Sequence, residues 1–357
     1  METDYIVVGL GLGGIAFCEQ LRENGKRFVV FDGDSQQSSS VAGGVYNPVV
    51  LKRFTAAWRS EEQLKIAVPF YQKLEQILSG KLVYPMPVYR KFASVEEQNL
   101  WFEAADKPSL APYLSPRIIQ NTNTGIDAPH GFGEVWHTGR IAVKALIEKY
   151  ADLLLSQDCL RKEHLDYEVL EGTGTGVRYK DIKARQIVFA EGFGMLSNPF
   201  FKYLPLRGAK GELLTIRAPE LNLNSIVKSS VFLIPVGEDR YKVGATYNWK
   251  DKTNVTTSRA REELLTKLKS LLKCDFEVIK QEAGIRPTVA DRRPLAGRHP
   301  QENNVYVLNG LGTRGTLVGP YVAKQLYDFI ETGASLDEEI DISRFRSRFR
   351  KYQAAQG

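Results

Sequence analysis

The sequence predicts an α/β protein, α+β overall, in which a mainly parallel sheet domain is interleaved with a mostly antiparallel β-sheet domain. Two observations lead to this prediction. Both ends of the 357-residue chain show a strand, a glycine-rich turn and a helix in that order. Between them, short apolar runs alternate with exposed turns, which is typical of antiparallel strands. A parallel domain assembled from separated segments accommodates both observations.

The composition narrows the class of protein. Hydrophobic residues at 43% and charged residues at 25% are ordinary for a globular protein. No apolar run approaches the roughly 18 residues that a membrane-spanning helix needs. The N-terminal METDYIVVGLG lacks the features of a secretory signal, so a cytoplasmic location is expected. The histidines and cysteines show no metal-ligand spacing, and we predict reduced thiols and no metal site.

The first 32 residues carry the clearest structural pattern. Residues 4–8 form a short apolar run, GLGLGG follows as a turn, and IAFCEQLREN predicts a helix that ends at Gly25. RFVVFD then predicts a second strand. Strand, helix and strand in this order predict the βαβ unit of a Rossmann-type domain.

The remaining elements follow from hydrophobic periodicity and turn signals. The predicted helices are 60–78, 139–156 and 259–273, the predicted strands are 184–192, 211–218, 230–236 and 240–249, and a final strand, glycine-rich turn and helix occupy 304–333.

The first glycine-rich turn matches a dinucleotide-binding pattern. Gly9, Gly11 and Gly14 satisfy G-x-G-x-x-G, with Gly13 inside it, and Asp32 ends the next strand. The first glycine permits a tight turn, the second admits a pyrophosphate near the backbone, and the third lets helix and strand pack. The helix N-terminus offers free N–H groups to the phosphates. Asp32 suits an unphosphorylated ribose, as in NAD or FAD, and leaves the choice between them open.

Further segments resemble the family of flavoproteins that includes D-amino-acid oxidase, glycine oxidase and sarcosine oxidase. SSSVAGGVYNPV (38–49), IVFAEGF (187–193) and NGLGTRGTLVGP (309–320) are similar to its cofactor segments. GAKGELLTI, FLIPVGEDRYKVGATY and GIRPTVADRRPLAG (284–297) are similar to its substrate domain and domain junction. The likeness covers nearly the whole chain in the right order. It implies FAD as the cofactor and hydride transfer from a substrate C–H next to nitrogen to flavin N5.

The resemblance also implies how the cofactor is held. The sarcosine-oxidase branch places a flavin-linking cysteine in the segment that here reads GIRPTVAD, which contains none, so noncovalent FAD is expected. We assign residues 1–84, 138–203 and 283–357 to an FAD-binding domain, and 85–137 and 204–282 to a substrate-binding domain. The expected cofactor-binding residues are Gly9, Gly11, Gly13, Gly14, Asp32, Ser40, Gly43, Gly44, Val45, Ala190, Gly192, Gly310, Gly312, Thr313, Arg314, Gly315, Thr316 and Leu317.

One arginine is a candidate for binding the substrate. Arg286 occupies the pattern G-x-R-P, where family members that oxidise amino acids place a carboxylate-binding arginine. A guanidinium suits this role because its planar fork meets a carboxylate with two parallel hydrogen bonds. We interpret Asp291, Arg292 and Arg293 instead as a charged junction between the domains.

The other candidate catalytic residues surround a departure from the family pattern. The residue before L-I-P is often tyrosine in D-amino-acid oxidases, and here it is Phe232, which has no hydroxyl. Either Tyr247 or Tyr46 replaces that hydroxyl, or the substrate is not a simple D-amino acid. Tyr46 and Asn47 either line the pocket near the substrate nitrogen or only cap the turn before Pro48, and both interpretations stay open.

Together these features predict an FAD-dependent oxidoreductase that acts on a small carboxylated amine or amino acid, with oxygen or another electron acceptor. An alternative is oxidation of a carboxymethylamino-modified wobble uridine in tRNA, because GGVYNPVV and LPLRGAKGELLTI also resemble the oxidase domain of bacterial tRNA-modifying enzymes. The net charge of +6 and the basic segment 343–352 suit tRNA. That segment is more typical of a C-terminal helix packed on the FAD domain. A non-catalytic flavoprotein is the second alternative.

Overall fold

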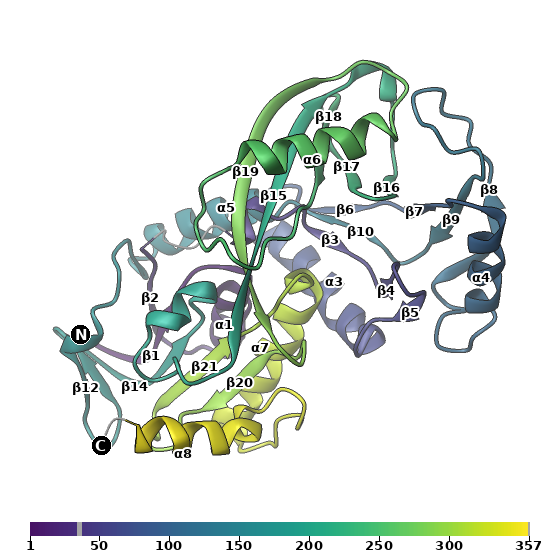
Figure 1. Cartoon of the computed structure of the whole chain (residues 1–357). Helices are drawn as coiled ribbons and strands as arrows, with labels where there is room; N and C mark the ends of the chain where they lie inside the picture. Colours follow the sequence, from purple (N-terminus) through teal and green to yellow (C-terminus); the bar gives the residue numbers. More distant parts are fainter. Residues whose placement is uncertain (34–37, 356–357) are drawn as a thin grey trace.

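The computed structural model describes residues 1–33 and 38–355 (Figure 1). Within these residues the chain forms two eight-stranded sheets, together with two small ones. Two long strands, β15 (Leu206–Arg217) and β19 (Glu277–Val289), run side by side through the middle of the molecule. Both strands belong to the second eight-stranded sheet, and their ends near Leu206 and Val289 lie against the first sheet.

The first sheet has a parallel centre. β1 (Glu2–Val8) lies between β2 (Phe28–Phe31) and β14 (Ile182–Phe189), and β21 (Val305–Asn309) follows parallel to β14. Parallel strands covered on both faces are rich in apolar residues, as β2 and β21 are here. This arrangement confirms the predicted Rossmann-type fold. The other strands of this sheet are β11 (Leu160–Arg161), β12 (Leu170–Gly172), β13 (Val177–Tyr179) and β20 (Leu295–Arg298).

Helices from distant parts of the chain cover this sheet. α1 (Leu12–Glu23), α3 (Ser60–Ile77), α5 (Val143–Ser156) and α7 (Gly315–Thr332) contribute to one hydrophobic core with β1 and β21. α1 and α7 lie against each other, which places the two glycine-rich turns at the same edge of the sheet. The other described α-helices are α2 (Ser38–Val41), α4 (Val95–Ala105), α6 (Ser258–Lys269) and α8 (Arg346–Ala354).

The second sheet runs in the order β19, β15, β18, β17, β16, β7, β9 and β8. Its neighbours are antiparallel except for β16 and β7, in line with the predicted antiparallel domain. α6 packs on one face through Leu264 and Leu268. The bounds of the shorter strands in this sheet are β7 (Val88–Lys91), β8 (Leu114–Ile119), β9 (Phe132–Val135), β16 (Ile226–Lys228), β17 (Phe232–Gly237) and β18 (Arg240–Gly244).

Two predicted elements differ from the structure. The predicted helix at 139–156 is preceded by a strand, because Gly139–Ile141 form β10 and α5 begins only at Val143. The predicted strand at 240–249 ends at Gly244, since the chain then turns back over β15. There Lys210 and Asn248 exchange two backbone hydrogen bonds of 2.9 Å. The small strands are β3 (Val45–Tyr46), β4 (Val49–Val50), β5 (Thr55–Ala56) and β6 (Val83–Pro85).

Within residues 1–33 and 38–355, no helix is long and apolar enough to cross a membrane, and no group of three or more histidine, cysteine or acidic residues could hold a metal ion. Cys18, Cys159 and Cys274 are free thiols. β19 is continuous across position 282, so the predicted boundary between the two domains falls inside a single strand.

Candidate active site

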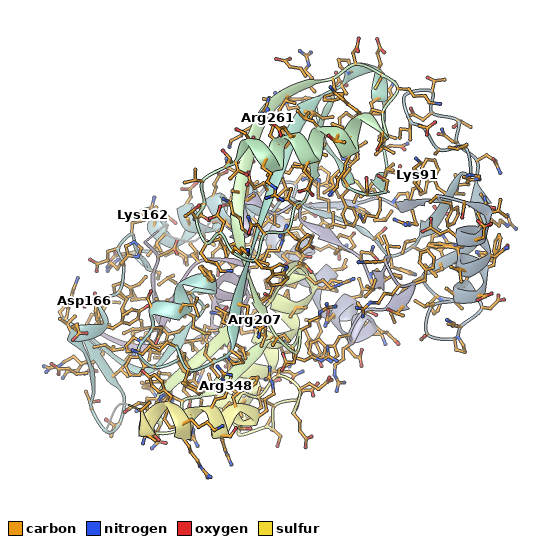
Figure 2. The ribbon with its side chains drawn as sticks, viewed as in Figure 1. Lys91, Lys162, Asp166, Arg207, Arg261 and Arg348 are labelled. Atoms are coloured by element: carbon orange, nitrogen blue, oxygen red, sulfur yellow. The ribbon has the colours of Figure 1, made fainter. Side chains whose placement is uncertain are left out.

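A cavity of about 740 Å³ lies where the two sheets meet. Its wall combines the first glycine-rich turn, the segment after α2, the end of β14 and the turn before α7. The face of the second sheet opposite α6 completes the wall with residues of β15 to β19. Segments that are hundreds of residues apart in sequence therefore share one cavity. The crowded sticks of Figure 2 show how side chains fill the space between the ribbons elsewhere.

Several glycines of the first glycine-rich turn have no room for a side chain. A Cβ on Gly14 would lie 1.9 Å from the carbonyl oxygen of Gly9, which has a left-handed φ of +99°. A Cβ on Gly13 would lie 2.7 Å from Leu308 of β21. Gly14 does not line the cavity, because it faces the strand and lets α1 pack against it. Asp32 lines the cavity, and one of its carboxylate oxygens accepts a hydrogen bond from the backbone N–H of Leu10 at 3.1 Å.

The segment after α2 forms the next part of the wall. Gly43, Gly44 and Val45 line the cavity, whereas Ser40 is not among the lining residues. A Cβ on Gly44 would lie 2.0 Å from the carbonyl oxygen of Ile141, so only glycine permits the segment to approach β10 this closely. This close approach presses the segment between β10 and the second sheet.

The turn before α7 is tied to the segments around it. Asn309, which sequence reasoning missed, donates a hydrogen bond from its side chain to the carbonyl oxygen of Gly192 at 2.9 Å. Its side-chain oxygen accepts from the N–H of Gly310 at 2.7 Å. Thr316 donates to the carbonyl oxygen of Val45 at 3.1 Å. Gly310 is not itself a lining residue. The lining residues in and after this turn include Gly312, Thr313, Arg314, Gly315, Thr316 and Leu317, and those just after β14 include Ala190, Glu191 and Gly192.

Arg314 has a structural role in addition to its place in the wall. Its guanidinium donates to the carbonyl oxygens of Asn47 and Val49, the latter at 3.0 Å. Burial lowers the pKa of Arg314 to about 10, with a nearby tyrosine opposing the shift, so the side chain stays charged at neutral pH. The arginine therefore fixes the segment after α2 against the turn before α7.

Arg286 lies on β19 in the wall formed by the second sheet. Its guanidinium lies directly over Gly211 of β15, where a Cβ would come within 2.1 Å of Nη2. Its carbon Cζ is 4.6 Å from the centroid of the Tyr247 ring, and Nη1 donates to the carbonyl oxygen of Thr246 at 3.4 Å. Burial lowers the pKa of Arg286, and no carboxylate of the described residues forms an ion pair with it. A charged guanidinium so placed has donors available for an anion.

The other three candidate catalytic residues differ in position. Tyr247 lines the cavity, with 59% of its surface exposed, and stacks on Arg286. Asn47 also lines the cavity, and its side-chain oxygen accepts from the N–H of Val49 at 2.7 Å, so it both caps the turn and faces the site. Tyr46 is not a lining residue. It is buried with its hydroxyl against Gly139, which removes it as a replacement for the missing hydroxyl at Phe232.

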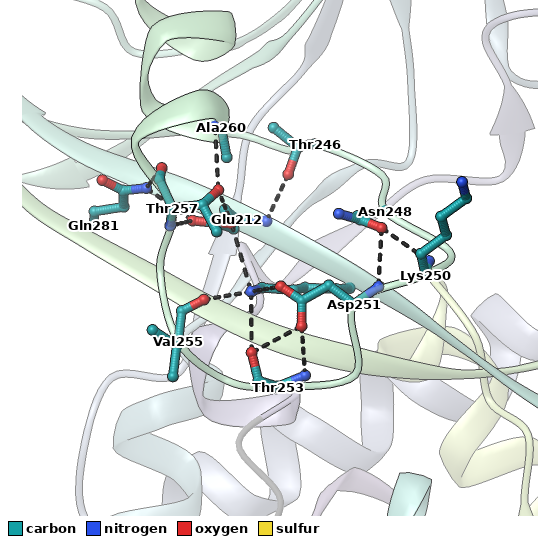
Figure 3. Close-up of polar contacts among 11 residues, drawn as sticks. Glu212, Thr246, Asn248, Lys250, Asp251, Thr253, Val255, Thr257, Ala260 and Gln281 are labelled. Atoms are coloured by element: carbon teal, nitrogen blue, oxygen red, sulfur yellow. Dashed lines mark hydrogen bonds and ion pairs between the residues drawn. The ribbon is translucent and has the colours of Figure 1, made fainter.

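A buried ion network outside the cavity supports the loop that carries Tyr247 (Figure 3). The ammonium group of Lys210 lies 2.5 Å from Asp251 and 3.8 Å from Glu212, and it also donates to the carbonyl oxygen of Val255. Glu212 accepts from the side chain and the backbone N–H of Thr257 at 2.8 and 2.9 Å. These contacts hold the middle and the second end of residues 245–257, and two hydrogen bonds between Glu212 and Thr246, at 3.0 and 3.2 Å, hold the first end. In the sequence, Lys210 and Glu212 are charged residues within the largely apolar strand β15, and this pattern could have indicated the network.

The charged cluster after β19 differs from the predicted junction. Arg293 pairs with Glu339 at 2.6 Å, and Asp291 pairs with Arg344 at 3.1 Å. Arg292 is exposed with a φ of +58°. Both ion pairs lie inside the C-terminal segment, because the chain folds back on itself there, and they do not join the segments assigned to different domains. The interpretation of this cluster as an interdomain junction was therefore wrong.

Comparison with known proteins gives the family. Residues 4–329 match the DAO family, described as FAD dependent oxidoreductase. The chain belongs to this family. It is thus an FAD-dependent oxidoreductase, which replaces the hypothesis of a non-catalytic flavoprotein. The glycine turn, Asp32 and the closely packed turn before α7 fit this cofactor, because they leave N–H groups and space that Cβ atoms would fill.

Several known proteins are similar to this chain over different lengths. Glycine oxidase from Bacillus licheniformis is 23% identical, with 92% of each chain covered. The chain spans about half or less of two other relatives. It aligns with 42% of glycine oxidase from Bacillus subtilis at 29% identity, and with 55% of the tRNA 5-methylaminomethyl-2-thiouridine biosynthesis bifunctional protein MnmC from Marinobacter nauticus at 22% identity. The latter match covers 91% of this chain.

Solved structures of DAO-like enzymes share the fold. Iminodiacetate oxidase from Chelativorans sp. BNC1 superimposes with a TM-score of 0.76 at 18% identity, covering 96% of this chain and 98% of that one. Glycine oxidase from Geobacillus kaustophilus gives a TM-score of 0.77 at 17% identity, with 96% and 98% covered. At these identities the likeness concerns the fold alone.

Proposed function

We propose that this oxidoreductase oxidises a C–N bond of a small carboxylated amine or amino acid. The observation that carries the proposal is Arg286, a cation in the cavity wall with no carboxylate partner among the described residues. A half-buried cation without a counterion favours an anionic ligand, because an anion restores the solvation that burial removes. The same cavity contains the glycines that fit the cofactor.

The protein's own residues would contribute orientation. Arg286 holds the substrate carboxylate through paired hydrogen bonds, and Tyr247 covers one face of the guanidinium. Phe232 and Leu213 supply an apolar wall that excludes water from the reacting carbon. Noncovalently bound FAD supplies the hydride acceptor. Oxygen or another compound would be the final electron acceptor. The names of the relatives, glycine oxidase and iminodiacetate oxidase, support this class of substrate.

The proposal is tested by anaerobic titration of the flavin with carboxylated amines. Glycine, sarcosine, iminodiacetate and D-alanine are added to the holoprotein, and loss of the flavin absorbance is followed. We expect Arg286→Met to lower kcat/KM about 30-fold or more, since truncating one partner of a buried charge pair costs about 2–5 kcal/mol. Arg207→Met on the exposed side of β15 is the matched control. Failure of every carboxylated amine to reduce the flavin, or equal effects of the two variants, would refute the proposal.

A second candidate substrate is a carboxymethylamino-modified wobble uridine in tRNA. Trp249 is 56% exposed and follows Tyr247 in the same loop, which offers aromatic surface to a nucleobase near the cavity. The match to MnmC over most of this chain also supports this candidate. Its substrate carboxylate would bind Arg286 in the same way.

The C-terminal basic segment gives the tRNA candidate less support than its sequence suggested. Phe349 of α8 is buried against Tyr203, and Arg348 donates to the carbonyl oxygen of Tyr203 at 3.2 Å. The aromatic residues of this helix therefore pack inward. The basic side chains labelled in Figure 2 also come from separate parts of the molecule. Filter binding of tRNA at low and high salt, with Trp249→Ala, tests this candidate, and no binding at low salt would remove it.

A further inference from the structure

Lys228 is a second cation in the same cavity. It lies at the end of β16 and lines the wall together with Phe232. Its ammonium group is 4.8 Å from the centroid of the Phe232 ring and donates to the carbonyl oxygen of Ser229 at 2.7 Å. No carboxylate of the described residues pairs with it. A lysine ammonium has three donors, so this group retains capacity for an anion.

The positive charges around Lys228 favour the binding of an anion beside it. Burial lowers the pKa of Lys228 to about 8, and Arg90 on β7 and Lys267 on α6 act in the same direction. Arg90 has its own partner in Glu97 of α4, and Lys267 pairs with Glu263. Neither acid is left for Lys228.

Another half-buried lysine, Lys242, has a purely structural role. Lys242 of β18 also has a pKa lowered by burial. Its ammonium group donates to the carbonyl oxygens of Val41 and Ala42 at 3.1 and 3.4 Å, and it does not line the cavity. Lys242 therefore ties the second sheet to the segment after α2. Lys228, in contrast, has one backbone partner and faces the cavity.

The register of the second sheet gives the spacing of the two cations. Leu213, Gly244, Phe232 and Lys228 pair in one row across β15, β18, β17 and β16. The guanidinium of Arg286 lies over Gly211, two residues from Leu213 on β15. The ammonium of Lys228 lies over the ring of Phe232 on β17. Strands β15 and β17 are two strand spacings apart, about 9.6 Å, and the offset of two residues along the strand adds about 6.8 Å at right angles, so the two cations are separated by roughly 12 Å.

We propose that Lys228 forms a second anion-binding subsite, and that the substrate is an extended amine with a second anionic group, a carboxylate or a phosphate, roughly 12 Å from the carboxylate on Arg286. The inference rests on the proposed function. It goes beyond it, because the two anions of a short diacid such as iminodiacetate are too close together to reach both cations. Phe232 then separates the two anions, which explains an apolar residue between two cations.

The distance between the two anion-binding residues can be tested with a homologous series of substrates of increasing chain length. N-carboxymethyl ω-amino acids, with from one methylene to about nine between the nitrogen and the second carboxylate, are compared with sarcosine by anaerobic flavin reduction. We expect kcat/KM to rise at about seven methylenes, because an extended chain advances about 1.2 Å per bond and then spans the roughly 12 Å between the cations. Analogues that end in a phosphate in place of the second carboxylate distinguish the two kinds of anion.

Substitution of Lys228 gives the decisive comparison. Lys228→Met should lower the ratio of kcat/KM for the preferred diacid over sarcosine about tenfold or more, and Lys228→Arg should restore most of it. Lys280→Met, at an exposed lysine of β19, is the control and should leave the ratio unchanged. The ratio should also fall as the pH rises through about 8, because Lys228 then loses its proton.

The outcomes separate this inference from the proposed function. If no carboxylated amine reduces the flavin, the proposed function fails. If sarcosine and the diacids reduce it equally at every chain length, or if Lys228→Met lowers both rates in the same proportion, only the second subsite is refuted. Flavin absorbance of each purified variant checks that it folds and binds FAD.

Discussion

Gly211 gives a way to move Arg286 without removing it. A Cβ at this position would lie 2.1 Å from Nη2 of Arg286, whereas ordinary contact begins at 3.4 Å. In Gly211→Ala the guanidinium must therefore move by about 1.3 Å. A shift of that size breaks the geometry of a paired hydrogen bond, and each charge-assisted bond contributes about 1.5–3 kcal/mol. We expect kcat/KM for carboxylated amines to fall about 10- to 100-fold.

The assay for Gly211→Ala compares substrate kinetics with stability. Anaerobic flavin reduction gives KM and the rate of reduction, and urea unfolding gives the free energy of unfolding. Because the atom displaced is the end of a long side chain, unfolding should change little, while KM rises. Gly172→Ala, where the nearest atom to an added Cβ is 3.6 Å away, is the matched control. Unchanged kinetics in Gly211→Ala would contradict the role assigned to Arg286, and a loss of stability without a change in KM would do the same.

Two further predictions concern stability. Lys210→Met should lower the free energy of unfolding by about 3–5 kcal/mol, because it leaves the buried carboxylate of Glu212 without its cation. Urea unfolding measures this difference. A change below about 0.5 kcal/mol would be inconsistent with the prediction. Burial lowers the pKa of His299 from 6.5 to about 4, so the unfolded chain binds more protons between these values and stability falls as the pH drops through that window. His299→Gln should flatten this dependence by about one proton in pH-dependent unfolding, and an unaltered slope would show that another group causes it.

The fold was largely predictable because its strongest signals are local. The strand, glycine turn and helix at each end depend on residues that are neighbours in sequence, and the apolar strands depend on their periodicity. The path after Gly244 was not predictable from periodicity. It depends on backbone hydrogen bonds between Asn248 and Lys210, which are far apart in sequence and whose pairing no local pattern encodes.

The sequence predicted which segments form the site. It did not predict which side chains in those segments contact one another. Residues in the glycine turns could be named because the steric need for glycine is local. The sequence did not distinguish Tyr46 from Tyr247, since both follow glycine-containing segments and only packing decides that one hydroxyl faces Gly139. Lys228 was missed because a lysine at a strand end is usually solvated. Its lack of an acidic partner appears only when the neighbouring strands are in place.

Tyr247 and the ion network of Lys210 together bear on the missing hydroxyl at Phe232. Tyr247 contacts Arg286 beside Phe232, and the network holds the loop that carries Tyr247. A guanidinium stacked on an aromatic ring keeps the donors at its edge free for a carboxylate, whereas a hydroxyl would assist by donating to the same carboxylate. Tyr247 can therefore orient Arg286 from its face while Phe232 keeps the space beside it apolar. That position of Tyr247 depends on Lys210, whose ammonium group holds Asp251 farther along the loop. If the proposed function holds, a residue outside the cavity determines the direction in which the substrate carboxylate can approach.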